Sequence, residues 1–121
     1  MKQPEQRLWD RISPSLIGRR WTRLESRGTT SGVGDAFGFF RKETHWIELK
    51  VGRPSMTALR SSQHDFIIDC VASNIPVWCC FEHNGRLFWY QGLPVGDPIT
   101  PPFYRPDLSH RRVFATSAAR S

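Results

Sequence analysis

The sequence predicts an α/β domain in which a small mixed sheet is flanked by helices. Two pairs of short apolar and aromatic runs, each joined by a polar turn, indicate two strand hairpins, and a helical segment lies between them. With 39% apolar and 12% aromatic residues among 121, the chain is able to form one core of its own. The order helix, strand, hairpin, long helix, hairpin is typical of a layered α/β fold.

A short helix and a short strand open the chain. Leu8 and Ile12 are four residues apart, as on one face of a helix, and they predict an amphipathic helix over residues 5–12. A Ser-Pro pair directly after Ile12 ends this helix, because the residue before a proline is disfavoured in the helical conformation. A strand is expected at residues 21–25.

A loop rich in glycine and serine then leads into the first hairpin. The loop covers residues 28–34, and the apolar runs 35–40 and 45–51 enclose the polar turn 41–44. Because both runs are rich in aromatic and β-branched residues, we predict two antiparallel strands here.

The next expected element is a long helix. Ser55 or Thr57 is suited to cap its first turn, and the helix is expected to reach about Ser73. Its predicted apolar stripe consists of Leu59, Phe66, Ile67, Cys70 and Val71.

The second hairpin begins with an apolar run at residues 75–81, which predicts a strand buried on both faces. Asn84-Gly85 supplies a tight turn into a strand at residues 86–90. Residues 92–121 are rich in proline and arginine, and we expect them to form an extension that wraps the domain or is partly disordered.

The sequence argues against an exported or membrane protein. No apolar run reaches the roughly 18 residues of a membrane span, and the first residues lack the apolar stretch of a signal peptide. The three cysteines, Cys70, Cys79 and Cys80, lack the spacing of a disulfide framework or a structural zinc site. We therefore expect a cytoplasmic protein that does not bind membranes.

Basic residues concentrate at the two ends of the chain. The formal net charge is +6, from 17 Lys and Arg against 11 Asp and Glu. Residues 1–30 hold seven basic and three acidic residues, residues 31–100 hold six and seven, and residues 101–121 hold four and one. Arginine binds phosphate through two parallel hydrogen bonds, so this distribution suits a polyanion that crosses basic flanks around an acidic centre.

Three charged residues are expected together at one end of the first hairpin. If the turn is centred on residues 42–43, Asp35 lies opposite Lys50. Side chains alternate along a strand, so Glu48 and Lys50 share a face while the apolar residues on either side of Glu48 point into the core. Asp35, Glu48 and Lys50 are therefore predicted to converge beside the glycine-rich loop.

Two carboxylates and an ammonium group suit phosphodiester hydrolysis. Asp35 and Glu48, with the main-chain carbonyl of Leu49, offer the oxygen ligands that Mg²⁺ prefers. A bound cation lowers the pKa of a coordinated water and stabilises charge on a phosphate, while Lys50 is suited to orient or deprotonate that water. The same residues also suit a surface hairpin held by salt bridges, and spacing alone does not decide between the two.

The order of these motifs resembles that of a known enzyme superfamily. Ser31-Gly-Val-Gly-Asp35, a strand ending in Ile47-Glu-Leu-Lys50 and a helix carrying Gln63 resemble the PD-(D/E)XK nucleases, in particular the small VRR-NUC-like and phage Holliday-junction-resolvase-like enzymes. In those enzymes Gly-x-Pro-Asp is followed by Glu-x-Lys at the end of the next strand and then by a Gln. The resemblance covers about residues 20–82. It implies a restriction-endonuclease-like αβββαβ core, with residues 1–91 as the nuclease domain.

The resemblance implies a role for each matching residue. Asp35 and Glu48 would bind the metal together with the Leu49 carbonyl, and Lys50 would be the catalytic lysine. Gln63 would contact active-site groups or phosphate from the helix behind the site.

Two further points follow from the family pattern. Many members add an upstream glutamate, for which we favour Glu25 over Glu5 on the first helix. The proline of Pro-Asp is Gly34 here, and a glycine is able to direct the backbone in the same way at some entropic cost.

The predicted function is that of a Mg²⁺-dependent DNA endonuclease, with Mn²⁺ as a substitute, that cuts duplex or branched DNA in the cytoplasm, or in a host's cytoplasm if phage-encoded. Phosphate contacts are expected from Arg23, Arg27, Arg53 and Arg60. Strand aromatics such as Trp46 are expected in the core or in the interface of a twofold homodimer, whose two sites would cut both strands. The alternative function is a nucleic-acid-binding module that keeps the nuclease fold without catalysis.

Overall fold

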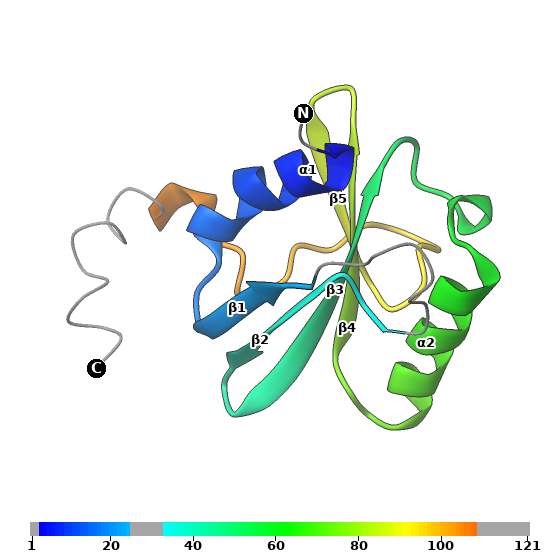
Figure 1. Cartoon of the computed structure of the whole chain (residues 1–121), viewed down its shortest axis with the longest axis horizontal. Helices are drawn as coiled ribbons and strands as arrows, with labels where there is room; N and C mark the ends of the chain where they lie inside the picture. Colours follow the sequence, from blue (N-terminus) through cyan, green and yellow to red (C-terminus); the bar gives the residue numbers. More distant parts are fainter. Residues whose placement is uncertain (1–2, 25–32, 109–121) are drawn as a thin grey trace.

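The structure is a computed structural model that describes residues 3–24 and 33–108. In this part of the chain, five strands form a sheet in the order β1-β2-β3-β4-β5, with α1 on one face and α2 on the other (Figure 1). The elements are α1 (Pro4–Ile12), β1 (Arg19–Arg23), β2 (Ala36–Phe40), β3 (Glu43–Val51), α2 (Ser61–Ala72), β4 (Val77–His83) and β5 (Arg86–Gln91). The predicted small mixed sheet with flanking helices and its element order are confirmed.

The strand β3 occupies the centre of the sheet. It pairs antiparallel with β2 and parallel with β4, and α2 is the crossover that parallel pairing requires. Because of this crossover, α2 begins near the edge of the sheet where β3 ends. The last residues of β3 and the first turn of α2 therefore meet at one edge of the sheet.

The helix α1 covers one face of the sheet. It begins with Pro4 in its first turn, where the missing N–H of proline is tolerated, and its buried side chains include Leu8 and Ile12. These pack in one cluster with Ile47 and Leu49 of β3. The prediction that the apolar residues on either side of Glu48 point into the core is confirmed.

The predicted start of the second helix is wrong. Residues 56–58 form a separate 3₁₀ turn, and α2 begins only at Ser61. The cause is a cap made by one side chain, in which the backbone N–H of Arg60 donates to Oε1 of Gln63 at 2.9 Å. The predicted stripe is right for the buried Ile67 and Cys70 but wrong for Val71, which is 54% exposed.

The register of the first hairpin also differs from the prediction. The turn consists of two residues, Arg41 and Lys42, both with positive φ, and β2 pairs Ala36 with Ile47. Such a two-residue turn usually contains Asn or Gly, so this one had no sequence signal. As a result, Asp35 lies at the level of Glu48 and not opposite Lys50.

The second hairpin follows the prediction closely. Residues 77–81 of β4 are all buried, as expected for a strand covered on both faces. Asn84 and Gly85 both have positive φ and connect β4 to β5.

The segment after β5 contributes to the core. Phe103 is fully buried and joins the cluster under α1, where its ring lies 4.8 Å from the ring of Trp21 and 5.5 Å from that of Trp78. An antiparallel bridge pairs Leu16 with Tyr104. Two stretches far apart in the sequence are thereby joined beside the sheet.

Replacing Phe103 with Ala is expected to lower the free energy of unfolding by about 3 to 5 kcal/mol, because the ring is fully buried among other aromatic rings. Urea denaturation measures this change. Ile99→Ala is the matched control, since Ile99 lies in the same segment but is 56% exposed. This substitution should lower the free energy of unfolding by less than about 1 kcal/mol. Equal effects of the two substitutions would contradict the role assigned to Phe103.

Candidate active site

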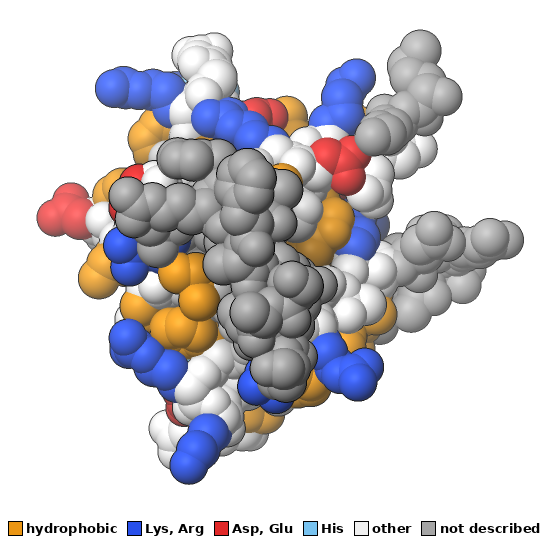
Figure 2. Space-filling model, turned by 90° about the vertical axis from the view of Figure 1, so that its left-hand side faces the viewer, with side chains coloured by type: hydrophobic (Ala, Val, Ile, Leu, Met, Phe, Trp, Pro, Cys, Tyr) orange, Lys and Arg blue, Asp and Glu red, His pale blue; other side chains and the backbone are white. Residues whose placement is uncertain are grey.

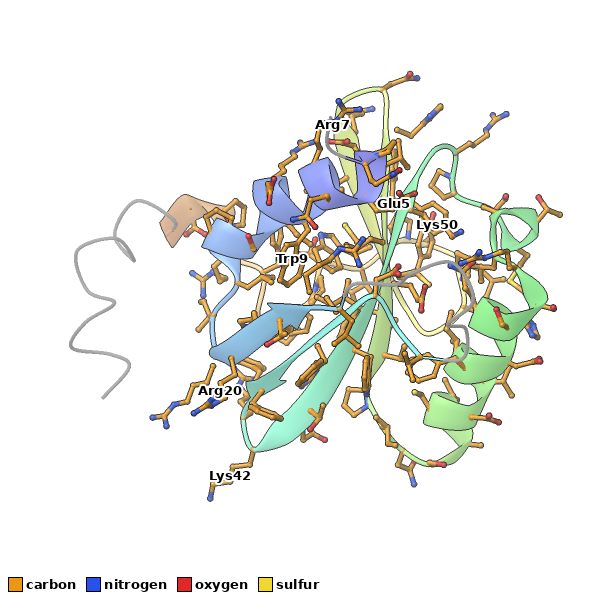
Figure 3. All side chains as sticks on the ribbon, viewed as in Figure 1. Glu5, Arg7, Trp9, Arg20, Lys42 and Lys50 are labelled. Carbon is orange, nitrogen blue, oxygen red and sulfur yellow. The ribbon has the colours of Figure 1, made fainter. Side chains whose placement is uncertain are left out.

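A polar hollow of about 460 Å³ lies at the edge of the sheet where β3 ends, between the first turns of α1 and α2. Figure 3 shows Glu5 of α1 and Lys50 of β3 at this end of the molecule. The lining residues are Gln3, Glu5, Arg23, Asp35, Leu49, Lys50, Arg60 and Gln63. The hollow is in the lower part of the size range of small-ligand sites, and most of its lining side chains are polar.

Asp35 is held in place by the hairpin. Its backbone N–H donates to the carbonyl of Ile47 at 3.2 Å, and its Oδ2 accepts a 2.8 Å hydrogen bond from the backbone N–H of Leu49. The guanidinium of Arg23 donates to the main-chain carbonyl of Asp35 at 3.2 Å and lies 3.9 Å from Oδ1. Both the backbone and the carboxylate of Asp35 are thus fixed by neighbouring strands.

Glu48 is the most unusual group of the site. Its side chain is fully buried, and no N–H or O–H group among the described residues donates to either carboxylate oxygen, so its one side-chain partner is the Asp35 carboxylate, to which a protonated Glu48 donates. Burial and the neighbouring charge of Asp35 raise the pKa of Glu48 to about 9, although the positive charges of Lys50 and Arg60 oppose this shift. Without a bound cation, Glu48 is therefore a neutral carboxylic acid at pH 7.

A buried thiol lies beside Glu48. The parallel register pairs Glu48 of β3 with Cys79 of β4, and burial together with the charge of Glu48 raises the pKa of Cys79 to about 12. Cys79 is therefore a neutral thiol that fills space under the site. Sequence reasoning missed this neighbour, since the register between two parallel strands has no local sequence signal.

Lys50 and Gln63 reach the hollow from two different elements. Lys50 lies on the same face of β3 as Glu48 and is half-buried. Gln63 is buried in the first turn of α2, where its side chain accepts a hydrogen bond from Arg60. The hairpin and the second helix thus bring Asp35, Glu48, Lys50 and Gln63 to one place, although the roles of these residues stay predictions.

Two residues are candidates for the upstream glutamate of the family pattern. Glu5, in the first turn of α1, lines the hollow. Glu25 lies outside the described residues, and so does Arg27. Sequence reasoning gave Glu5 second place, because the distance in sequence between the first helix and the hairpin hides their proximity in space.

We expect Glu5→Gln to lower the rate of metal-dependent DNA cleavage by about 10- to 100-fold, since a carboxylate in the hollow helps bind cations and orient water. Glu25→Gln is the paired variant, and cleavage rates of both are measured under the same single-turnover conditions. A large loss in Glu25→Gln with none in Glu5→Gln would reverse this assignment.

The predicted phosphate-binding arginines divide into two groups. Arg23 and Arg60 line the hollow, close enough to act on a phosphate bound there. Arg53 is exposed in the turn after β3 and is not among the lining residues. Sequence reasoning missed a second task of Arg23, which also holds the backbone of Leu24 through a 2.8 Å hydrogen bond to its carbonyl.

Gly34 has a packing role in the site. A Cβ atom at this position would lie 2.9 Å from the ring of Trp46 and 3.2 Å from that of Phe66. The absence of a side chain lets the chain pass close over both rings just before Asp35. The departure from the family's proline is therefore explained by close contact.

Comparison with known proteins finds similarity in structure alone. A scan of the sequence against known protein families gave no match, and a search of curated proteins found no relative. Among solved structures, Archaeoglobus fulgidus Hjc, a Holliday junction resolvase from an archaeal hyperthermophile, aligns over 72% of this chain and 73% of its own, with 11% identity and a TM-score of 0.51. This chain has a restriction-endonuclease-like fold.

This restriction-endonuclease-like fold is the architecture that the motif order implied, with the αβββαβ core followed by β5. A second solved structure, SSO0001, aligns over 97% of this chain and 56% of its own at 13% identity and a TM-score of 0.36, and nothing is inferred from it. In the described part of the chain, no helix has the length and apolar character needed to cross a membrane.

Proposed function

We propose that this protein is a metal-dependent endonuclease that hydrolyses phosphodiester bonds in DNA. The observation that carries the proposal is Glu48, a fully buried carboxyl that accepts no hydrogen bond from an N–H or O–H group of the described residues, beside Asp35 and Lys50. An ionised carboxylate buried in this way is costly to the folded state, and a bound cation offsets that cost. Restriction-endonuclease-like folds with this residue set suit cleavage of a phosphodiester.

The residues present fit a hard divalent cation such as Mg²⁺ or Mn²⁺. Asp35 and Leu49 line the hollow, and Glu48 is buried directly beside Asp35. The protein ligands would therefore be Asp35, Glu48 and the main-chain carbonyl of Leu49, since the described residues contain no group of three or more His, Cys, Asp and Glu side chains suited to a metal. Mg²⁺ commonly uses one or two carboxylates and keeps several waters or phosphate oxygens. When bound, the cation would lower the pKa of a coordinated water and offset negative charge on the phosphate.

The remaining residues have distinct tasks. The ammonium group of Lys50 orients the attacking water and stabilises negative charge that develops on the phosphate. Glu5 supports water and cation from the first turn of α1, and Gln63 fixes the first turn of α2 against the site. Arg60 and Arg23 bind the phosphates next to the scissile bond.

Branched DNA is the substrate we propose. The Hjc structure is that of a Holliday junction resolvase, and the motif order of this chain resembles VRR-NUC-like and phage resolvase-like enzymes. Cutting both strands of a junction requires two active sites, so we further propose that the protein acts as a twofold homodimer.

Cleavage of a labelled four-way junction and of its matching linear duplex, with Mg²⁺ or Mn²⁺ and with EDTA, tests the proposal. We expect cutting that requires the metal, with paired symmetrical nicks in the junction. Metal-dependent cutting of both DNAs at equal rates would keep the nuclease but contradict the preference for branched DNA. Tight binding without cutting would contradict catalysis and favour the nucleic-acid-binding module.

A further inference from the structure

An aromatic row crosses the face of the sheet on the side of α2. We use this name for Phe39, Phe37, Trp46 and Phe66, which come from β2, β3 and α2. The ring centroids lie 6.1 Å apart for Phe39 and Phe37, 5.2 Å for Phe37 and Trp46, and 5.2 Å for Trp46 and Phe66. The row is therefore continuous from the outer part of the sheet to the second helix.

The core does not account for the outer end of this row. Phe39 is 39% exposed, and Phe37 and Trp46 are only half-buried. The opposite face of β2 supplies the core contacts, because Phe40 packs near Phe103 and Gly38 lies against Trp21. A strand with one buried face normally carries polar residues on its other face. Packing in the core therefore does not explain why Phe37 and Phe39 occupy the outer face of β2.

The outer end of the aromatic row is surrounded by basic side chains. Arg19 pairs with Phe39 across the β1–β2 ladder, and Arg20 and Lys42 are exposed close by. The guanidinium of Arg41 lies over the ring of Phe40 on the other face and is not part of this rim. Figure 3 shows Arg20 and Lys42 projecting outward at this corner of the sheet, and Figure 2 shows Lys and Arg side chains bordering hydrophobic surface on this side of the molecule.

The acidic residue nearest to this corner points the other way. The carboxylate of Glu43 lies 3.8 Å from Nε2 of His45, which belongs to the face covered by α1. Exposed rings bordered by cations are the combination with which proteins bind single-stranded nucleic acid, since the rings stack on bases and the cations attract phosphates.

The aromatic row leads directly to the candidate active site. Trp46 and Glu48 are two residues apart on the same face of β3, a separation of about 7 Å along a strand. Gly34 joins them, because a Cβ there would lie 2.9 Å from Trp46 and 3.6 Å from Oε1 of Glu48. A strand of DNA with its phosphate in the hollow therefore has the row within reach of the neighbouring bases.

We infer that the aromatic row is a docking surface for unpaired bases of a DNA strand. One part of this inference rests on the proposed nuclease function, namely that the scissile phosphate lies next to the unpaired nucleotides. A second copy of this chain is the competing occupant of such an apolar face. The basic rim disfavours it, since a twofold contact through this face brings the arginines and lysine of both copies together.

Fluorescence anisotropy in EDTA tests the inference with the full chain, a labelled dT 12-mer and a blunt duplex of the same length. Phe39→Leu keeps an apolar side chain but removes the flat ring, and we expect it to weaken binding of the single strand about 5- to 150-fold. Binding of the duplex should change less than about twofold. Phe39→Tyr should bind both DNAs like the parent, and Ile99→Ala is the control for an exposed apolar residue elsewhere.

Two outcomes would overturn the inference. One is a Phe39→Leu variant that binds the single strand as tightly as the parent does. The other is light scattering that finds a dimer of the parent which Phe39→Leu dissociates, because the row is then an interface between two copies. The assay contains no metal, so its result is independent of cleavage. Ring-dependent binding without metal-dependent cutting would keep the docking surface and reject the nuclease.

Discussion

Lys50→Ala is expected to reduce metal-dependent DNA cleavage by at least about 10²- to 10³-fold. Lys50 is the ammonium group that shares a face of β3 with Glu48, and removal of a group that stabilises developing charge commonly has an effect of this size. Because Lys50 is half-buried, the free energy of unfolding should change by less than about 1 kcal/mol. Single-turnover cleavage and urea denaturation of the same preparations measure both quantities.

Two further variants sharpen this test. Lys50→Arg keeps the charge but replaces a compact ammonium with a larger planar guanidinium whose donors have a different geometry, so it should restore little activity. Arg105→Ala is the control, since Arg105 is an exposed basic residue outside both the hollow and the basic rim of the aromatic row. Cleavage by Lys50→Ala at the rate of Arg105→Ala would remove Lys50 from the chemistry.

Glu48→Gln is expected to stabilise the metal-free protein at pH 8. The pKa of Glu48 is about 9 in the folded protein and near 4.5 in the unfolded chain. Between these values the unfolded chain has released a proton that the folded protein still holds, so the free energy of unfolding falls as pH rises from about 4.5 to 9. A glutamine does not titrate, so the free energy of unfolding of the variant should be higher than that of the parent by on the order of 3 kcal/mol at pH 8.

Urea denaturation in EDTA at pH 4.5 and pH 8 measures this difference. The two free energies of unfolding should differ by less than about 1 kcal/mol at pH 4.5, where Glu48 is neutral in the folded protein and only half ionised in the unfolded chain. A gap of the same size at both pH values would contradict the titration of Glu48 as its cause.

Addition of Mn²⁺ is expected to favour the parent over Glu48→Gln in thermal stability. A cation that binds only the folded protein raises its stability, so the parent should gain thermal stability with Mn²⁺ concentration. Glu48→Gln removes one of the two carboxylates proposed as ligands and should gain much less. Equal gains in both proteins would place the cation elsewhere.

The sequence predicted which face of β3 Glu48 and Lys50 share, but not the register of the first hairpin. The face shared by Glu48 and Lys50 follows from alternation along one strand, which needs only local information. The partner of Asp35 depends on the turn, and Arg41 and Lys42 adopt positive φ without the Asn or Gly that normally indicates it. A turn two residues shorter than expected moved Asp35 from Lys50 to Glu48.

Two features of the site had no clear signal in the sequence. The start of α2 is set locally by Arg60 and Gln63, because Ser55 and Thr57, the expected caps, form a hydrogen bond with each other at 3.1 Å. Glu5 enters the hollow only because α1 packs across β3, a contact between distant segments that no pattern within a single element indicates.

The fully buried ring of Phe103 has a consequence for synthesis of the protein in the cell. In the described part of the chain, β1 to β5, α1 and α2 are complete by residue 91, yet the ring that fills the space between Trp21, Trp78 and Trp89 follows only at residue 103. A nascent chain on the ribosome therefore holds all the residues of the proposed site before its core is able to close. If the chain cuts DNA, full cutting activity requires synthesis to proceed past Phe103.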